Sequence, residues 1–88
     1  MGKRSREKPA RLGEKLLQIR NSLGLSQTDI WRRLELEGKN HYTVISAYEN
    51  DKQEPSLTTI LRYARIAGIS TDVLLDDELD LPKKLKRS

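Results

Sequence analysis

The chain has 88 residues, of which 34% are charged and 35% hydrophobic, and its formal net charge is +4. A chain of this length forms one domain with a modest core, and the lack of cysteine excludes disulfides, thiolate metal sites and a cysteine nucleophile. No apolar run approaches the ~20 residues of a membrane span, and the charged N-terminus lacks the apolar segment of a signal peptide, so we expect a cytoplasmic protein without a membrane partner.

The positive charge lies at the two ends of the chain. Residues 1–11 and residues 82–88 each carry a net charge of +4, whereas the rest of the chain carries −4. We therefore divide the chain into a basic flexible arm (1–8), a folded domain (9–76) and an acidic-then-basic extension (77–88). The basic ends can contact phosphates or another acidic surface, or they can be solvated tails only.

The first predicted helix spans about residues 10–23. Its apolar residues recur at the spacing of one helical face, and they are Leu12, Leu16, Ile19 and Leu23. Pro9 marks the boundary before this helix, because the residue that precedes a proline is disfavoured in helical conformation. Gly24 is placed to end the helix in a left-handed conformation.

The second predicted helix begins after Ser26. The hydroxyl of Ser26 and the carboxylate of Asp29 form a Ser-x-x-Asp capping pattern, in which each side chain can bond the backbone N–H of the other residue. Ile30 and Leu34 then lie four residues apart and share an apolar face. A turn that contains Gly38 follows.

The third predicted helix runs from Tyr42 to about Asn50 and has the features of a helix that enters the DNA major groove. Ile45 and Tyr48 point inward, whereas the opposite stripe offers hydroxyl, amide and methyl groups that can read base edges. That stripe consists of Tyr42, Thr43, Ser46, Ala47 and Asn50. The plainer alternative is that Tyr42 and Thr43 only begin a surface helix.

Two more helices follow. Pro55 and Ser56 open the fourth predicted helix, and Gly68 ends it. Its predicted apolar face comprises Leu57, Ile60, Leu61, Ala64 and Ala67. Ser70 can cap a short fifth helix, and Pro82 argues against one continuous helix through the extension.

The chain resembles the lambda-repressor-like (Cro/XRE) helix-turn-helix family over roughly residues 11–76. The resemblance rests on Leu25-Ser26-Gln27, Ile30, Leu34, Ile45, Tyr48-Glu49-Asn50, Lys52, Glu54-Pro55-Ser56, Leu61, Ala64, Gly68-Ile69-Ser70 and Leu74-Leu75. It implies an all-α, compact five-helix domain with basic extensions at both ends. It also implies a sequence-specific, repressor-like transcriptional regulator that binds double-stranded DNA as a homodimer.

The resemblance assigns DNA contacts to individual residues. It places the base-reading side chains at Tyr42, Thr43, Ser46 and Ala47. It places phosphate contacts at Gln27, which opens the second helix with Thr28, and at Lys52 just after the reading helix. A helix N-terminus favours anions on physical grounds as well.

Three residues before the reading helix are further candidates for phosphate contact, namely Lys39, Asn40 and His41. The alternative for Asn40 and His41 is that one of them caps the helix. His41 is the only histidine, which argues against a histidine metal site.

The resemblance also implies two structural features. Arg20 and Glu49 match an ion pair that fixes the reading helix against the first helix, rather than a direct DNA contact of Arg20. The dimer interface falls on the last helix, at Ile69, Val73, Leu74 and Leu75.

The chain departs from the family pattern at three places. The turn over residues 35–41 is longer than the three or four residues usual in the motif, so it either extends the second helix or forms a loop. Trp31 stands where the family has a small alanine, and we expect its ring to pack over this turn rather than to serve as a stacking platform. Asp51 replaces a glycine and must tolerate a left-handed conformation.

A second class of function stays open, namely a protein-interaction adaptor or antitoxin module on the same scaffold, with a toxin or another regulator as its partner. We expect no catalytic residue and no cofactor, because the sequence has no cysteine, one histidine and no phosphate-binding glycine loop. We expect no metal either, because the acidic run of Asp76, Asp77, Glu78 and Asp80 lacks the spacing and the glycine of a calcium loop. That run is interpreted as a solvated face or as the counter-charge of a basic tail. Salt-dependent, sequence-selective affinity for duplex DNA would separate the two classes.

Overall fold

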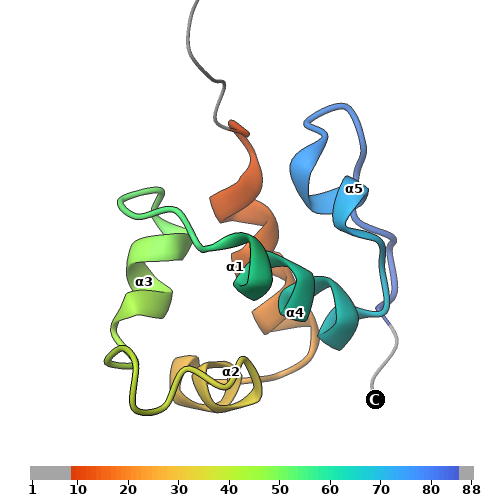
Figure 1. Cartoon of the computed structure of the whole chain (residues 1–88). Helices are drawn as coiled ribbons and strands as arrows, with labels where there is room; N and C mark the ends of the chain where they lie inside the picture. The colour runs from red at the N-terminus through yellow and green to blue at the C-terminus, as the bar shows by residue number, and fades with distance from the viewer. Residues whose placement is uncertain (1–8, 86–88) are drawn as a thin grey trace, which may run out of the picture.

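The computed structural model describes residues 9–85, and all regular secondary structure in this range is helical. The helices are α1 (Leu12–Ser22), α2 (Gln27–Arg33), α3 (Val44–Glu49), α4 (Leu57–Ala67) and α5 (Thr71–Leu75). Figure 1 shows α3 and α5 on opposite sides of α1, with α4 drawn across it. The predicted all-α, five-helix fold is therefore confirmed, whereas the predicted basic arm (1–8) lies outside the described residues.

The core receives side chains from every helix. Its largest fully buried apolar members are Leu16, Ile19, Ile30, Leu34, Ile45, Tyr63 and Leu74. The apolar stripe predicted for the first helix enters this core as expected. Among residues 9–85, no helix is long and apolar enough to cross a membrane.

The predicted capping box at Ser26 is present, whereas Ser70 begins α5 without a side-chain cap hydrogen bond. Ser26 Oγ accepts a hydrogen bond from the Asp29 backbone N–H (3.0 Å), and Asp29 Oδ2 accepts one from the Ser26 N–H (3.2 Å), which completes a capping box. These two bonds lower the pKa of Asp29, because they stabilise its charged form. Gly24 and Gly68 follow α1 and α4 with φ values of 69° and 73°, so both supply the left-handed turn that was predicted.

The predicted apolar face of α4 needs correction. Leu57 and Leu61 are 79% and 39% exposed, whereas Tyr63, absent from the predicted face, is fully buried. Successive helical residues are rotated by about 100°, so a face centred on Ile60 and Ala64 takes in Tyr63 and leaves Leu61 at its edge. Leu57 lies in the first turn of α4, and its exposure leaves an apolar side chain on the surface.

Lys15 is a charged residue within the core. It is 0% exposed, and its Nζ donates to the carbonyls of Val73 (2.7 Å) and Asp76 (2.9 Å) at the C-terminal end of α5. Burying an ammonium group is costly unless it is bonded, and the carbonyl end of a helix attracts cations. Lys15 therefore fastens α5 to α1.

The first part of the extension packs against the start of α1. Asp77 accepts hydrogen bonds from the backbone N–H groups of Ala10 (2.9 Å) and Arg11 (3.1 Å), and Asp80 Oδ1 lies 2.8 Å from Arg11 Nη2. The bonds from Ala10 and Arg11 lower the pKa of Asp77. The interpretation of these acids as a solvated face or as the counter-charge of a basic tail is thus wrong for Asp77, which bonds backbone N–H groups at the N-terminal end of α1. It agrees with Asp80, whose side chain is 80% exposed and pairs with Arg11 of the basic N-terminal stretch.

Candidate nucleic-acid interface

Helix α3 separates buried residues from accessible ones. Ile45 and Tyr48 are 0% and 4% exposed, as predicted, and Val44 is buried as well. On the other side of the helix, Tyr42, Thr43 and Asn50 are exposed, and Ser46 and Ala47 are half-buried. The five residues of the predicted reading stripe are therefore all accessible.

The helix itself begins two residues later than predicted, at Val44 rather than at Tyr42. The N–H groups of Val44, Ile45 and Ser46 bond the carbonyls three residues earlier, at 2.9–3.1 Å. This is the 3₁₀ pattern common at helix N-termini. Tyr42 and Thr43 thus lie in a tight turn that leads into α3.

His41 supports this turn with its imidazole ring. Its Nδ1 lies 3.4 Å from the Thr43 backbone N and 3.1 Å from Thr43 Oγ1. The backbone N–H can donate to the imidazole nitrogen, which leaves fewer unbonded donors at the start of α3. The geometry favours the capping alternative for His41, whereas the side chain of Asn40 makes no such bond among the described residues.

Tyr42 is held between two other rings. The His41 ring centroid lies 4.5 Å from that of Tyr42 at an interplanar angle of 32°, and Trp31 makes an edge contact at 6.4 Å and 73°. Trp31 Nε1 also donates to the Asn40 carbonyl at 3.1 Å. Trp31 therefore packs over the long turn, as expected, and supports Tyr42, which stays 40% exposed.

The long turn is an ordered loop rather than an extension of α2. Leu36 is 4% exposed and belongs to the core, while Glu35 and Gly38 adopt positive φ values of 60° and 83°. Arg62 of α4 donates from Nη1 to the Leu34 carbonyl at 2.9 Å. The loop is thereby tied to the core and to α4.

Arg20 and Glu49 form the ion pair that the resemblance implied. Arg20 Nε and Nη2 lie 2.7 and 3.1 Å from the two carboxylate oxygens, and Nη1 donates to the Leu25 carbonyl at 3.1 Å. The bond to Glu49 raises the pKa of Arg20. Burial, with a smaller contribution from Glu49, raises the pKa of Tyr63, so its hydroxyl stays neutral beside the pair. This bidentate geometry joins α3 to α1.

A glycine allows α1 and α3 to approach closely. A Cβ atom on Gly13 would lie 2.7 Å from Asp51 Oδ1 and 2.9 Å from the Glu49 carbonyl oxygen. Asp51 has a φ of 59°, the left-handed conformation expected where the family has glycine. Neither Gly13 nor its contact was predicted, because a lone glycine in a helical pattern does not indicate which segment it faces.

The remaining candidate DNA contacts surround this helix. Gln27 and Thr28 are half-buried at the start of α2, and Lys39 and Lys52 are exposed. Asn50 Nδ2 donates to the Ser46 carbonyl at 2.9 Å and lies 3.2 Å from Ser46 Oγ. Asn50 is therefore accessible, but its amide is partly occupied within α3.

The candidate dimer surface is smaller than predicted. Leu74 is 0% exposed, so it is part of the protomer core and cannot present a side chain to a second copy. Ile69 and Val73 are half-buried, and Leu75 is 38% exposed. In residues 9–85, no cluster of histidine and acidic side chains could hold a metal ion.

The geometry is that of a helix-turn-helix domain, with a capped α2, an accessible α3 and a framework that fixes α3 against α1. The helix-turn-helix family matches residues 16–74, which is more than half of the chain. The chain belongs to this family, in its Cro/C1-type branch, and the predicted membership is confirmed.

One curated relative is the HTH-type transcriptional regulator ImmR of Bacillus subtilis (strain 168). It is 31% identical to this chain over 64 residues, which are 73% of this chain and 47% of ImmR. The chain thus spans about half the length of this relative.

Three solved structures share the fold. A complex of SinR protein with SinI protein is 20% identical (TM-score 0.64) over 76% of this chain and 62% of that chain. A second structure shows SinR, described as the master regulator for biofilm formation, in complex with DNA. It is 21% identical to this chain (TM-score 0.62) and covers 74% of this chain and 98% of that chain. The hypothetical transcription factor NHTF from Neisseria is 25% identical (TM-score 0.64) over 88% of this chain and 78% of that chain.

Proposed function

We propose that this protein is a sequence-specific regulator of transcription that binds double-stranded DNA and reads the major groove with α3 and the turn before it. The observation that carries the proposal is the accessible stripe from Tyr42 to Asn50 on a helix fixed by the buried Arg20–Glu49 pair. A reading helix must present short polar groups and methyl groups at a defined position, and this stripe offers both.

The family and the relatives support the proposal. ImmR is named as a transcriptional regulator, and SinR has been solved in complex with DNA. In the proposed complex, Gln27, Lys39 and Lys52 contact phosphates and set the register of the protein, while the stripe specifies bases.

A homodimer would place two copies of α3 in successive major grooves, roughly 34–36 Å apart. Leu75 and the half-buried Ile69 and Val73 are the residues of α5 that remain accessible for such a contact. The bound site would then be an inverted repeat, because a two-fold symmetric protein matches a two-fold symmetric site.

The test is selection of bound sequences from a random duplex pool at near-physiological salt, with the triple variant Tyr42→Ala, Thr43→Ala, Ser46→Ala in parallel. We expect an inverted repeat to be enriched by the wild-type protein and lost with the variant. The proposal is wrong if no motif emerges and residual binding vanishes with modest added salt, since charge alone would then account for the binding.

An adaptor or antitoxin that binds a protein partner is the second candidate. Leu57 and Leu61 favour it, because they leave apolar side chains exposed on α4 and such surfaces mark interaction sites when they are contiguous. SinR has also been solved with SinI protein. Under this alternative, Leu57→Ser with Leu61→Ser would abolish partner binding, whereas the selected DNA motif would be absent in the wild-type protein as well.

A further inference from the structure

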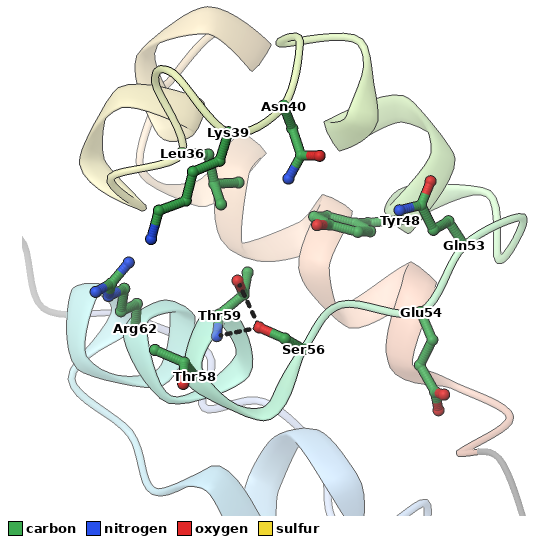
Figure 2. Close-up of a pocket in the computed structure, with 10 residues that line it drawn as sticks. All are labelled: Leu36, Lys39, Asn40, Tyr48, Gln53, Glu54, Ser56, Thr58, Thr59 and Arg62. Carbon is green, nitrogen blue, oxygen red and sulfur yellow. Dashed lines mark hydrogen bonds between the residues drawn. The ribbon is translucent and has the colours of Figure 1, made fainter.

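A polar cleft of about 450 Å³ opens between the long loop and the start of α4. Three parts of the chain form it: residues 36–40 of the loop, Tyr48 of α3, and residues 53–62. In Figure 2 the side chains of Lys39, Asn40, Tyr48 and Arg62 turn toward a common space. Its volume is within the range of small-molecule sites, roughly 300–1,000 Å³.

The hydroxyl of Tyr48 points into this cleft. Tyr48 is only 4% exposed, and Figure 2 shows its hydroxyl oxygen directed toward the middle of the lining residues. Burial raises the pKa of Tyr48. The hydroxyl is therefore protonated at neutral pH. Among the described residues, the only buried side-chain polar atom without a hydrogen-bond partner is the Tyr63 hydroxyl, so the Tyr48 hydroxyl is open to the cleft and can donate to a molecule bound there.

The charged groups of the cleft are mostly cationic. Lys39 is exposed and forms no ion pair within residues 9–85. Arg62 also lines the cleft; its Nη1 donates to the Leu34 carbonyl, and its Nη2 lies 3.6 Å from the exposed carboxylate of Glu35. In Figure 2 the side chains of Lys39 and Arg62 converge at one end of the cleft.

Two other polar lining residues agree with this pattern. The side-chain amide of Asn40 turns toward the Tyr48 hydroxyl, whereas the carboxylate of Glu54 points away from it (Figure 2). The lining thus includes an ammonium, a guanidinium, a phenol and an amide, beside the hydroxyl side chains of Ser56, Thr58 and Thr59. All four can donate hydrogen bonds, and together they complement an anion with several oxygen atoms.

We propose that this cleft binds a phosphate-type oxyanion through Lys39, Arg62 and the Tyr48 hydroxyl. Two sources share this chemistry: a free phosphorylated small molecule, or a backbone phosphate of bound DNA, in which case the inference rests on the proposed function. The loop that lines the cleft continues directly into Tyr42, and Tyr48 lies on α3. An anion in the cleft would thus contact α3 and the loop that leads into it.

The first arm of the test uses pyrophosphate without DNA, at matched ionic strength, and follows backbone amide chemical shifts of the full chain. We expect saturable shifts over residues 36–40, at Tyr48 and over residues 56–62. Tyr48→Phe and Lys39→Gln should each raise the Kd at least about tenfold, which corresponds to about 1.4 kcal/mol. Arg65→Gln, which removes an exposed cation of α4 that does not line the cleft, should leave the Kd unchanged.

The second arm uses the duplex selected from the random pool. If the oxyanion is a DNA phosphate, Tyr48→Phe weakens binding to all duplexes without changing the salt slope, and Lys39→Gln lowers that slope by about one. The two variants should be non-additive when combined, because both residues contact the same phosphate. Thermal denaturation shows whether each variant is folded.

The inference is overturned if pyrophosphate gives no saturable shifts and Tyr48→Phe binds DNA as the wild type does. It is also overturned if pyrophosphate binds Tyr48→Phe and wild type equally. A protein that selects a motif but fails both arms keeps its proposed function and loses the cleft. A protein that selects no motif yet binds pyrophosphate through Tyr48 keeps the cleft and loses the function.

Discussion

Loss of one partner of the Arg20–Glu49 pair should severely destabilise the domain. The side chains of Arg20 and Glu49 are only 16% and 5% exposed, so Glu49→Gln leaves a guanidinium with little access to water. Breaking a buried ion pair in this way costs about 3–5 kcal/mol. A domain of this size has a total stability of roughly 4–13 kcal/mol, so the variant should lose a large part of it.

Replacement of both partners separates a structural role from a DNA contact. Arg20→Met combined with Glu49→Leu removes both charges and keeps the packing volume, so stability should return close to the wild-type value. The Leu25 carbonyl then loses its donor, which limits the recovery by about 1 kcal/mol.

The measurements are the free energy of unfolding from urea titration and the affinity for the selected duplex. We expect Glu49→Gln to be unstable, and the double variant to be stable and to bind DNA within a few-fold of the wild type. A cost below about 1 kcal/mol for Glu49→Gln would refute the structural role, since such values are typical of exposed pairs. A stable double variant that loses DNA affinity would show instead that Arg20 contacts DNA.

Substitutions at three further positions test other contacts. Gly13→Ala should lower the thermal midpoint, although alanine favours helices by about 1 kcal/mol, because the new Cβ would lie 2.9 Å from the backbone carbonyl oxygen of Glu49, which cannot move aside as the Asp51 side chain can. A raised midpoint would contradict the close approach. The pKa of Asp77 is lowered in the folded state, so the Asp77 carboxylate stabilises the fold fully above its ordinary pKa, and this stabilisation is lost as the pH falls through the folded-state pKa. Asp77→Asn should therefore reduce the free energy of unfolding at pH 7. It should also make the urea midpoint less sensitive to pH below about pH 4. Trp31→Ala should reduce the preference for the selected motif, because it releases Tyr42, whereas Trp31→Phe should largely keep that preference. Competition assays between duplexes measure it. Equal losses of affinity for all duplexes would argue against a role of Trp31 in supporting Tyr42.

Local signals in the sequence predicted much of the fold. The capping box at Ser26 and the left-handed glycines at positions 24 and 68 depend on neighbouring residues only, so a single segment contains all the information needed. The apolar stripe of α1 was equally clear, because its spacing matches one helical face. The Arg20–Glu49 pair came from the family resemblance, since its partners lie 29 residues apart.

Contacts between distant segments were missed for a common physical reason. A lysine is ordinarily a surface residue. Lys15 can be buried only because α5 supplies carbonyl groups that accept its hydrogen bonds, and one of them, that of Val73, lies 58 residues later in the chain. Asp77 bonds N–H groups that are 66 and 67 residues away. The burial of Leu36 depends on the conformation of the long loop. Glu35 adopts a positive φ in this loop, which the preference of glutamate does not indicate.

The reading stripe was located correctly as an accessible surface, but the start of its helix was not. The 3₁₀ turn at Tyr42 and Thr43 depends on the His41 ring and on the Trp31 edge contact. Such side-chain supports arise from the long loop and have no counterpart in the periodicity of the helix. Their effect is to hold Tyr42 at the front of the stripe.

The most direct test of base reading by α3 compares a substitution at a proposed base-reading residue with one at a proposed phosphate-contacting residue. Affinities for the selected duplex and for single-base-pair variants of it should be measured at several salt concentrations. We predict that Ser46→Ala relaxes the preference at one base pair by about 1–3 kcal/mol, while Lys52→Gln weakens all duplexes equally and lowers the salt slope by about one. If Ser46→Ala and Lys52→Gln both act uniformly on every sequence, α3 does not read bases in this protein.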